Sequence, residues 1–175
     1  ILGGIPLYLS MFDDSISIKE NVIKNCLSTT GYLFNEIETL LRMELKETYF
    51  YKNIMLAINA GASTFNSIKD KVDEEAAKVA KYMNVLFHLG FIKKEVPCGE
   101  KEKSRNTLYS ICDNYFAFYF AFIFKHQNML NGLISPELYY EREFTKERLN
   151  SFIGLRFEAM CETYLKNRFY NGKMP

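Results

Sequence analysis

Hydrophobic residues in the first part of the chain recur at intervals of three and four, a spacing that is typical of α-helices. Short polar segments at 13–15 and 28–31 interrupt this spacing, and their residue types favour helix caps and turns. The sequence therefore predicts two or three helices within residues 6–46. Their expected buried positions are Leu7, Leu9, Phe12, Ile18, Val22, Ile23, Cys26, Leu33, Ile37, Leu40, Leu41 and Leu45.

Three shorter helices are predicted between residues 47 and 90. The first ends at Gly61 and the third at Gly90, because glycine enters the left-handed C-terminal conformation without a Cβ penalty. Asp73 is expected to cap the start of the third helix. Hydrophobic positions at helical spacing give each helix a buried side: Phe50, Ile54, Ala57 and Ile58, then Ile68 and Val72, then Val79, Met83, Leu86 and Leu89.

Two segments that favour β-strands follow these helices, at 91–97 and 107–111, and a charged loop separates them. Three helices, a strand, a polar wing and a second strand form the order of a winged helix-turn-helix. We therefore predict a winged helix-turn-helix at residues 47–112.

Helices are also predicted after the hairpin. Asp113 caps a helix that runs to about His126, and its aromatic residues cover nearly every side, so this helix should be buried between layers. Two more helices are expected at 136–150 and 152–169. The inner side of the last one should hold Phe152, Ile153, Phe157, Met160, Cys161, Tyr164 and Leu165. The predicted fold class is mainly α with one small β-hairpin.

Composition limits the possible classes of protein. Hydrophobic residues at 48% and charged residues at 25% fit a globular chain, and no apolar run is long enough to cross a bilayer. A net charge of +1 gives no overall attraction to nucleic acid, so DNA binding would need a local basic patch. The four cysteines are scattered without a C-x-x-C pair, and no signal peptide precedes them. We expect reduced thiols, no metal site and a cytoplasmic location.

The third helix of the winged segment is the candidate recognition helix, since a helix fits the major groove. Lys78 and Lys81 suit phosphates, and Asn84 suits an adenine edge. Acidic residues at 73–75 oppose a DNA backbone at the helix start, although they also stabilise the helix N-terminus. The outward residues are predicted to be Ala77, Lys78, Lys81, Tyr82 and Asn84.

The predicted wing carries a second basic group. Lys101, Lys103 and Arg105 lie in its loop, and Lys93 and Lys94 precede them in the first strand. Three glutamates in the same region dilute these five cations, so the patch is modest. Two interpretations remain open: a nucleic-acid surface, or a solvated face on a module that contacts protein.

Other candidate residues favour structural roles. Glu158 is a lone acid with Arg156 near it on the same helix, whereas a divalent cation needs several oxygen ligands together. His88 and His126 lie on apolar helical stretches without a nucleophile or acid in a triad-like pattern. The aromatic run at 115–124 lacks the interleaved basic residues of a base-stacking platform, so core packing is expected.

Four segments in order resemble the C-terminal half of the archaeal-type AAA+ (STAND-related) ATPases, whose C-terminal region is restriction-endonuclease-like. Together they span nearly the whole chain. They are Gly3-Gly4-Ile5-Pro6-Leu7-Tyr8-Leu9; Phe87-His88-Leu89-Gly90-Phe91-Ile92; Tyr109-Ser110-Ile111-Cys112-Asp113-Asn114-Tyr115-Phe116-Ala117-Phe118-Tyr119; and Gly154-Leu155-Arg156-Phe157-Glu158.

This resemblance implies that Gly4 and Pro6 lie near a bound nucleotide, at the start of a helical lid. From the residues alone, the same two positions also fit an ordinary entry into a helix, with Pro6 at the first helical position. The family's phosphate-binding loop would lie before Ile1, and no G-x-x-x-x-G-K-[ST] occurs in this chain. The chain therefore contains no catalytic residues or cofactor of its own, and ATP and Mg are implied for the parent protein.

Three parts follow from the resemblance: a lid remnant at 1–46, the winged helix at 47–112, and a helical segment at 113–175 that opens a further domain. Because the chain begins at Ile1 beside two glycines, we expect it to be a piece of a longer protein. The predicted function is a non-catalytic portion of an ATPase. Its winged helix would bind duplex DNA, or relay the nucleotide state to another protein or to the missing N-terminal ATPase domain. The alternative is a protein–protein or oligomerisation module without nucleic-acid binding.

Overall fold

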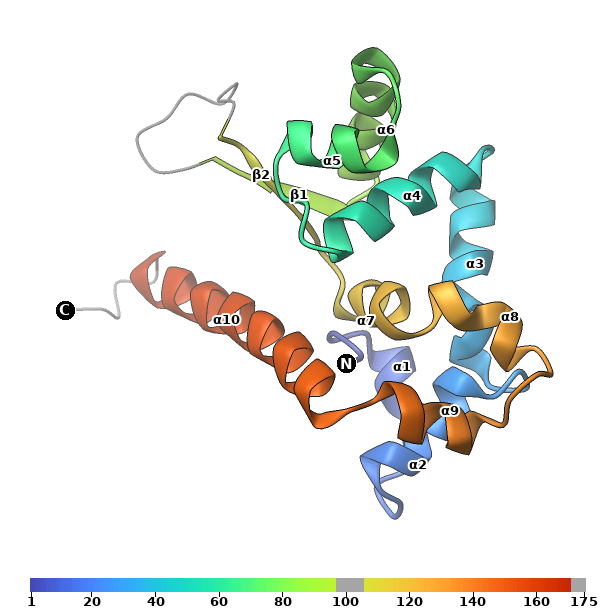
Figure 1. Cartoon of the computed structure of the whole chain (residues 1–175). Helices are drawn as coiled ribbons and strands as arrows, with labels where there is room; N and C mark the ends of the chain where they lie inside the picture. Colours follow the sequence, from blue (N-terminus) through green and yellow to red (C-terminus); the bar gives the residue numbers. More distant parts are fainter. Residues whose placement is uncertain (97–105, 171–175) are drawn as a thin grey trace.

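The structure, a computed structural model, describes residues 1–96 and 106–170 of the chain. In this part the chain is mainly helical with one two-stranded sheet, which confirms the predicted fold class (Figure 1). The elements are α1 (Pro6–Ser10), α2 (Ile18–Val22), the π-helix η1 (Ile23–Leu27), α3 (Tyr32–Glu44), α4 (Thr48–Asn59), α5 (Phe65–Val72), α6 (Ala76–His88), β1 (Ile92–Glu95), β2 (Leu108–Ile111), α7 (Asn114–Phe122), the 3-10 helix η2 (Phe124–His126), α8 (Gln127–Leu130), α9 (Pro136–Glu143) and α10 (Lys146–Tyr170).

The first helices follow the predicted order. Pro6 occupies the first turn of α1, and Ser17 caps α2 through a reciprocal capping box with Glu20. Gly31 precedes α3 at a close approach between backbones. A Cβ built there would lie 2.5 Å from the carbonyl oxygen of Asn25, so only glycine fits without a shift.

The winged segment has the predicted order of three helices and a hairpin. Gly61 and Gly90 follow α4 and α6 with φ values of +90° and +74°, which confirms their predicted roles. β1 and β2 pair antiparallel, with Ile92 opposite Ile111. Thr64 forms an isolated bridge to Leu108, so the start of α5 holds the other edge of β2.

Asp73 does not cap α6, contrary to the prediction. It is the C-cap of α5 and has a left-handed backbone, with φ 54° and ψ 53°. Aspartate tolerates this conformation better than most residues, so it can end one helix and leave a link before the next. Glu75, with an extended backbone, is the residue that precedes α6.

α7 forms the centre of the molecule, beneath α4 and beside α3 (Figure 1). Asp113 accepts hydrogen bonds from the backbone N–H groups of Tyr115 (2.7 Å) and Phe116 (3.0 Å), as predicted. The core packing expected of the aromatic run is confirmed, since all of α7 except Asn114 and Ala121 is buried. The helix ends at Phe122, earlier than the predicted His126, and η2 continues the chain.

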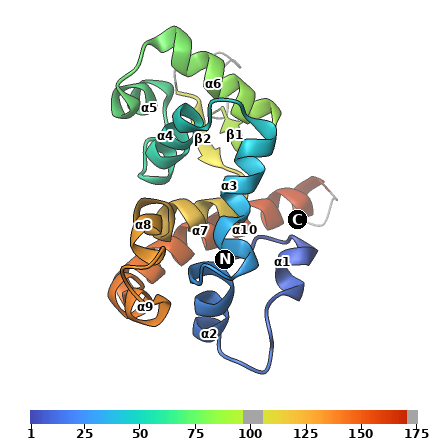
Figure 2. The ribbon, with the colours of Figure 1, turned by 90° about the vertical axis from the view of Figure 1, so that its right-hand side faces the viewer.

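Buried residues from the first helices, the winged segment and the last helices join in one hydrophobic cluster. Figure 2 shows α7 near the middle of the molecule, below the winged segment. The Tyr115 hydroxyl donates to the carbonyl oxygen of Leu33 at 2.6 Å, which ties α7 to α3. On the other side of α7, the Asn59 side-chain amide is assigned in its flipped orientation. Its nitrogen then donates to the Ala117 carbonyl oxygen and its oxygen accepts from the Ala121 N–H, each at 3.1 Å. The winged segment therefore rests on α7.

The last two helices divide at a different place from the prediction. The break lies at Phe144 and Thr145, whereas the sequence favoured residue 151. The ring of Phe144 packs at 4.5 Å from that of Phe122, measured between ring centroids, and this contact turns the chain toward the core. Thr145 Oγ1 then accepts from the N–H of Arg148 at 3.4 Å, as a cap of α10 does.

The predicted inner side of α10 is wrong. Phe152 alone is buried among the residues of this helix, all of which the structure describes. Figure 1 shows α10 running outward from α7, below the hairpin. Because the helix leaves the core after its first turns, its remaining apolar side chains have no second layer against them: Ile153, Phe157, Met160, Tyr164 and Leu165 are exposed, and Cys161 is half-buried.

Candidate nucleic-acid interface

α5 and α6 form the helix-turn-helix part of the winged segment. Thr64 begins α5 with a capping box in which its hydroxyl accepts from the N–H of Ser67 at 3.2 Å. α6 then packs on α4 through one side. The buried residues of α6 are Val79, Tyr82, Met83 and Leu86.

Tyr82 lies inside, although the sequence placed it outside. It follows Val79 by three residues and precedes Leu86 by four, so it shares their side of the helix. Its ring contacts those of Phe50 and Tyr51, with centroids 5.4 and 4.7 Å away. Its hydroxyl donates to Glu47, and this hydrogen bond raises the pKa of Tyr82 to about 12.

The outer side of α6 carries three exposed polar residues in a row. Lys81, Asn84 and His88 are three and four residues apart, which places them along one line of the helix. His88 Nδ1 lies 2.7 Å from the carbonyl oxygen of Asn84. Ala77 and Ala80, also exposed, lie beside this row, and their small side chains leave the helix backbone open to close approach.

Lys78 lies apart from that row. Its ammonium group pairs with Glu74 at 3.0 Å and is 3.4 Å from the centroid of the Phe50 ring. Both contacts hold the side chain at the flank of α6, toward α4. The predicted contact of Lys78 with phosphate would compete with these intramolecular contacts.

The hairpin adds a cation next to the outer side of α6. Lys94 of β1 is exposed, and its Nζ lies 4.8 Å from the ring centroid of Phe87. It is opposite Tyr109 in the strand register, so both side chains point to the same face of the hairpin. The helix and this face enclose a cleft of about 150 Å³, lined by Phe65, Ala80, Met83, Asn84, Phe87, Lys94 and Tyr109.

We name Lys81, Asn84, His88, Lys94 and Tyr109 the α6–β1 face. The sequence predicted Lys81 and Asn84 as binding residues and named Lys94 among the basic residues of the wing. It gave His88 a structural role and did not name Tyr109 as a binding residue. The alternation of strand residues could have found Tyr109, since Lys94 and Tyr109 occupy the same face of the hairpin in the observed register. The predicted wing cations Lys101, Lys103 and Arg105 lie outside the described residues.

Charges are divided along α6. Neither Lys81 nor Lys94 has a carboxylate partner among the residues that the structure describes. At the start of the helix, Asp73 and Glu75 are exposed. The positive part of the α6–β1 face is therefore Lys81, near the middle of α6, together with Lys94 of β1.

Gly4 and Pro6 belong to the turn into α1, which lies on the opposite side of α7 from α6 (Figure 1). The turn that contains them packs against the start of α7. A Cβ at the preceding Gly3, which has φ +71°, would lie 2.9 Å from Asp113 Oδ2. The two predicted sets of binding residues therefore occupy separate regions.

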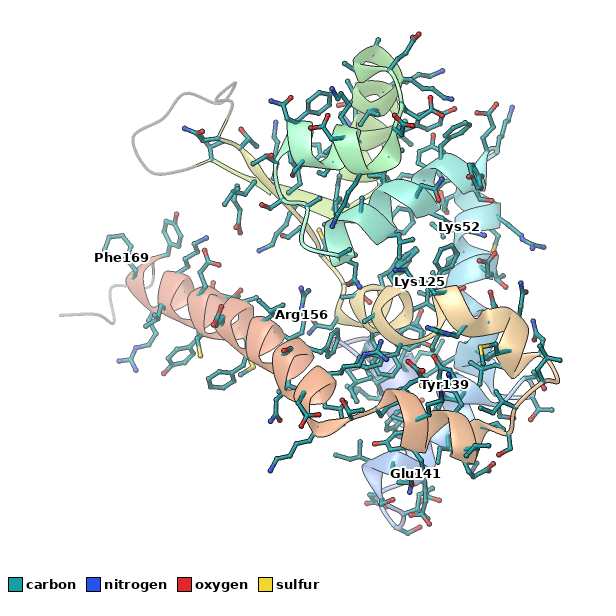
Figure 3. All side chains as sticks on the ribbon, viewed as in Figure 1. Lys52, Lys125, Tyr139, Glu141, Arg156 and Phe169 are labelled. Atoms are coloured by element: carbon teal, nitrogen blue, oxygen red, sulfur yellow. The ribbon has the colours of Figure 1, made fainter. Side chains whose placement is uncertain are left out.

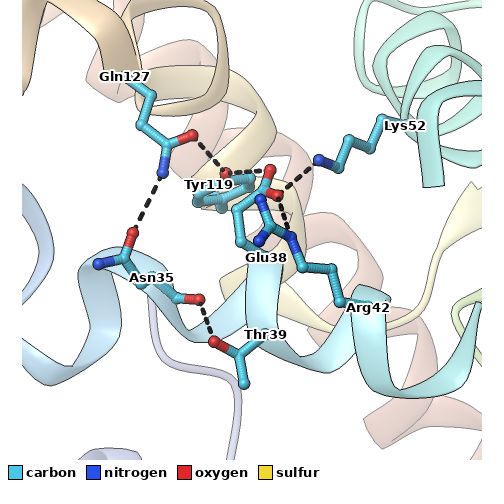
Figure 4. Close-up of polar contacts among 7 residues, drawn as sticks. All are labelled: Asn35, Glu38, Thr39, Arg42, Lys52, Tyr119 and Gln127. Atoms are coloured by element: carbon cyan, nitrogen blue, oxygen red, sulfur yellow. Dashed lines mark hydrogen bonds and ion pairs between the residues drawn. The ribbon is translucent and has the colours of Figure 1, made fainter.

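A polar cluster joins α3, α4, α7 and α8 on another side of the molecule (Figure 4). Glu38 accepts from Lys52 Nζ at 2.6 Å, and both side chains are mostly buried. The Tyr119 hydroxyl lies 3.2 Å from Glu38 and 3.3 Å from Gln127. The hydroxyl has one proton for two acceptors, the Glu38 carboxylate and Gln127 Oε1, so it can donate to only one of them at a time. Gln127 Nε2 in turn donates to Asn35 Oδ1 at 3.4 Å. Burial, reinforced by Glu38, raises the pKa of Tyr119.

Arg156 points from α10 toward the start of α7, and Figure 3 labels it there. Its Nε is buried without an acceptor among the described residues. Glu158, which lies two residues after Arg156 on the same helix, is exposed, and the nearby Glu162 pairs with Lys166 at 2.6 Å.

Within residues 1–96 and 106–170, no group of three His, Cys, Asp or Glu residues is placed to hold a metal ion. Within the same residues, no helix has the length and hydropathy to span a membrane.

Comparisons with known proteins give few relatives. No family model matches the sequence. An uncharacterised protein of Methanocaldococcus jannaschii, MJECL04, is 28% identical over 172 residues, which are 98% of this chain and 38% of that protein. This chain thus spans less than two-fifths of that relative. The structure of Lactococcus lactis ZitR, wild type in complex with DNA, covers 78% of this chain and 98% of its own with 16% identity and a TM-score of 0.38, which is too low to establish a common fold.

Proposed function

We propose that this chain binds duplex DNA through the α6–β1 face, without base-sequence specificity of its own. The observation that carries the proposal is the exposure of Asn84 and Lys94 at the cleft between helix and hairpin, with the exposed Lys81 one turn before Asn84 on the same side of α6. Two cations free of carboxylate partners in the described residues can each replace a counterion on a phosphate. An exposed amide and small alanines let α6 approach a groove edge.

The distribution of charge sets the orientation of this contact. Asp73 and Glu75 repel phosphates from the start of α6, so the DNA backbone would meet the middle of the helix, at Lys81, and β1, at Lys94. Lys78 would contribute little, because Glu74 and the Phe50 ring already hold its ammonium group. We therefore expect weak binding with a strong dependence on salt.

A titration of fluorescently labelled duplex DNA at low salt, followed by anisotropy, tests this proposal. Lys81→Gln/Lys94→Gln should weaken binding and reduce the salt slope of log Kobs by about 2, since each lysine contact contributes about 0.9. The matched control, Lys24→Gln/Lys125→Gln, removes two exposed cations outside the face. Absence of binding at tens of micromolar protein would refute the proposal, and so would equal losses in the two variants.

We further propose that the chain belongs to a longer ATPase of the AAA+ or STAND type, and that its winged helix conveys movement of the motor to DNA or to a partner. The four resembling segments support this, and the length of MJECL04 is consistent with it. The gene sequence upstream of Ile1 provides the test. A phosphate-binding loop there is the expected result, and an upstream region without one would overturn the ATPase assignment.

A further inference from the structure

α10 exposes many large apolar side chains that no other described element covers. The exposed side chains include Ile153, Leu155, Phe157, Met160, Tyr164, Leu165, Phe169 and Tyr170. Exposed large apolar side chains that gather on one helix favour an interaction site in a folded protein. Its arrangement along the helix indicates what covers it.

Four of these residues form one line along the helix, which we name the α10 seam: Ile153, Phe157, Met160 and Tyr164. Their spacing of four, three and four matches the contact positions of a coiled coil. Their exposed fractions are 52%, 58%, 59% and 57%. One step further at each end, the same line reaches an exposed asparagine, Asn150 and Asn167.

The seam is complementary to itself when one copy is reversed. Reading from Tyr164 back to Ile153 gives the same spacing as reading forward. In this register Ile153 meets Tyr164 of the partner subunit, and Phe157 meets Met160 of the partner subunit. Each layer then pairs an aromatic with an aliphatic side chain, and the terminal layers pair Asn150 with Asn167 of the partner subunit. A parallel pair would instead place identical aromatic rings opposite each other.

We propose that the α10 seam packs antiparallel against the α10 seam of a second copy of this chain. The dimer is symmetric, because each contact occurs twice across the two-fold axis. It does not depend on DNA binding.

The available area fits a weak dimer. A half-exposed seam residue presents on the order of 100 Å², given that aromatic side chains bury about 150–250 Å² each. The four seam residues then present about 400 Å², and with the smaller exposed parts of the half-buried Leu149 and Cys161 each copy contributes about 500 Å². The pair buries about 1,000 Å², the size of a weak interface, so dimerisation should depend on concentration.

Light scattering during gel filtration tests this dimer with the full chain, at loading concentrations from about 1 to 500 µM, which bracket a micromolar Kd. The mass should rise from monomer to dimer. Phe157→Glu/Met160→Glu should remain monomeric throughout. The matched control, Leu165→Glu/Phe169→Glu, also replaces one aromatic and one aliphatic exposed residue, on another side of α10, and should dimerise like the parent chain.

Disulfide trapping checks the register independently of those variants. In a background of Cys98→Ser/Cys112→Ser/Cys161→Ser, Ile153→Cys/Tyr164→Cys should form a covalent dimer under mild oxidation. Ile153→Cys alone should not form a covalent dimer. In the antiparallel register, position 153 of the two copies is offset by 11 residues along the helix, or roughly 16 Å. A monomer at every concentration would overturn the proposal in favour of another occupant, such as further polypeptide. Efficient trapping by Ile153→Cys alone, or a dimer that survives Phe157→Glu/Met160→Glu, would overturn it as well.

Discussion

Glu38 offers a quantitative test of the polar cluster beside α3, through the substitution Glu38→Gln. The change removes the negative charge that faces Lys52 at 2.6 Å and keeps an oxygen for the Tyr119 hydroxyl. Side-chain exposures of 13% for Glu38 and 15% for Lys52 leave the lysine little access to water. The ammonium group would therefore lose its counterion without regaining full hydration.

The expected cost lies between two limits. Removing one partner of a fully buried pair costs about 3–5 kcal/mol, whereas an exposed pair contributes about 0–1 kcal/mol. Because this pair is mostly buried, we expect Glu38→Gln to lower the free energy of unfolding by about 2–3 kcal/mol. Arg42→Gln should cost less than about 0.5 kcal/mol, since the arginine is 75% exposed and 3.8 Å from Glu38.

Urea unfolding followed by circular dichroism measures these differences. A second variant isolates the electrostatic cause. Glu38→Gln/Lys52→Met removes both charges, so it should be more stable than Glu38→Gln alone. Equal destabilisation by Glu38→Gln and Arg42→Gln, or no recovery in the double variant, would refute a desolvated ion pair.

Two further predictions concern alkaline pH and glycine packing. Burial raises the pKa of Cys26 to about 12 and also raises that of Tyr115, so the unfolded chain releases these protons at lower pH than the folded one. The contribution of these two groups to the free energy of unfolding should be complete below about pH 8.5 and fall as pH rises toward 12, at up to about 1.4 kcal/mol per pH unit for each group. A urea midpoint that stays constant to pH 11 would contradict this. Gly31→Ala should cost about 2–3 kcal/mol because its Cβ meets backbone oxygens at 2.5 and 2.6 Å. Gly154→Ala, with open space around it on α10, should instead stabilise by up to about 1 kcal/mol in thermal unfolding, and equal effects would refute the packing argument.

Local patterns in the sequence were sufficient to predict most of the helices and strands of the fold. Gly61, Gly90 and Asp113 ended or began helices as predicted, because each depends on its own backbone conformation and nearest neighbours. The aromatic run of α7 also indicated its burial, since a helix that is apolar on every side needs cover all around.

The errors arose where a choice depended on distant residues. Asp73 suits both a helix start and a left-handed helix end, and the packing of α5 against α4 selects the second. Phe144 breaks the chain before α10 because its ring fits against Phe122, a contact that spacing along the sequence does not reveal. α10 has apolar residues on several sides, so its pattern could not tell which side, if any, a neighbour covers.

The candidate interface was predicted in part for the same reason. Lys81 and Asn84 lie on the outer side of α6 as expected. Lys78 was expected beside them, but Phe50 of another helix draws its ammonium group to the flank. Joining Lys94 and Tyr109 to α6 required the register of the hairpin and its placement against the helix.

The position of α7 has a consequence for synthesis on the ribosome. The winged helix lies before α7 in the chain, yet it packs on α7, and Tyr115 bonds to a carbonyl 82 residues earlier. Such contacts between distant residues raise contact order and slow folding. When only residues 1–112 have left the ribosome, α7 is still missing. Neither the first helices nor the winged helix then has the helix on which it packs. Folding of the whole unit should therefore wait until α7 leaves the exit tunnel, and α7 then closes it in a single late step.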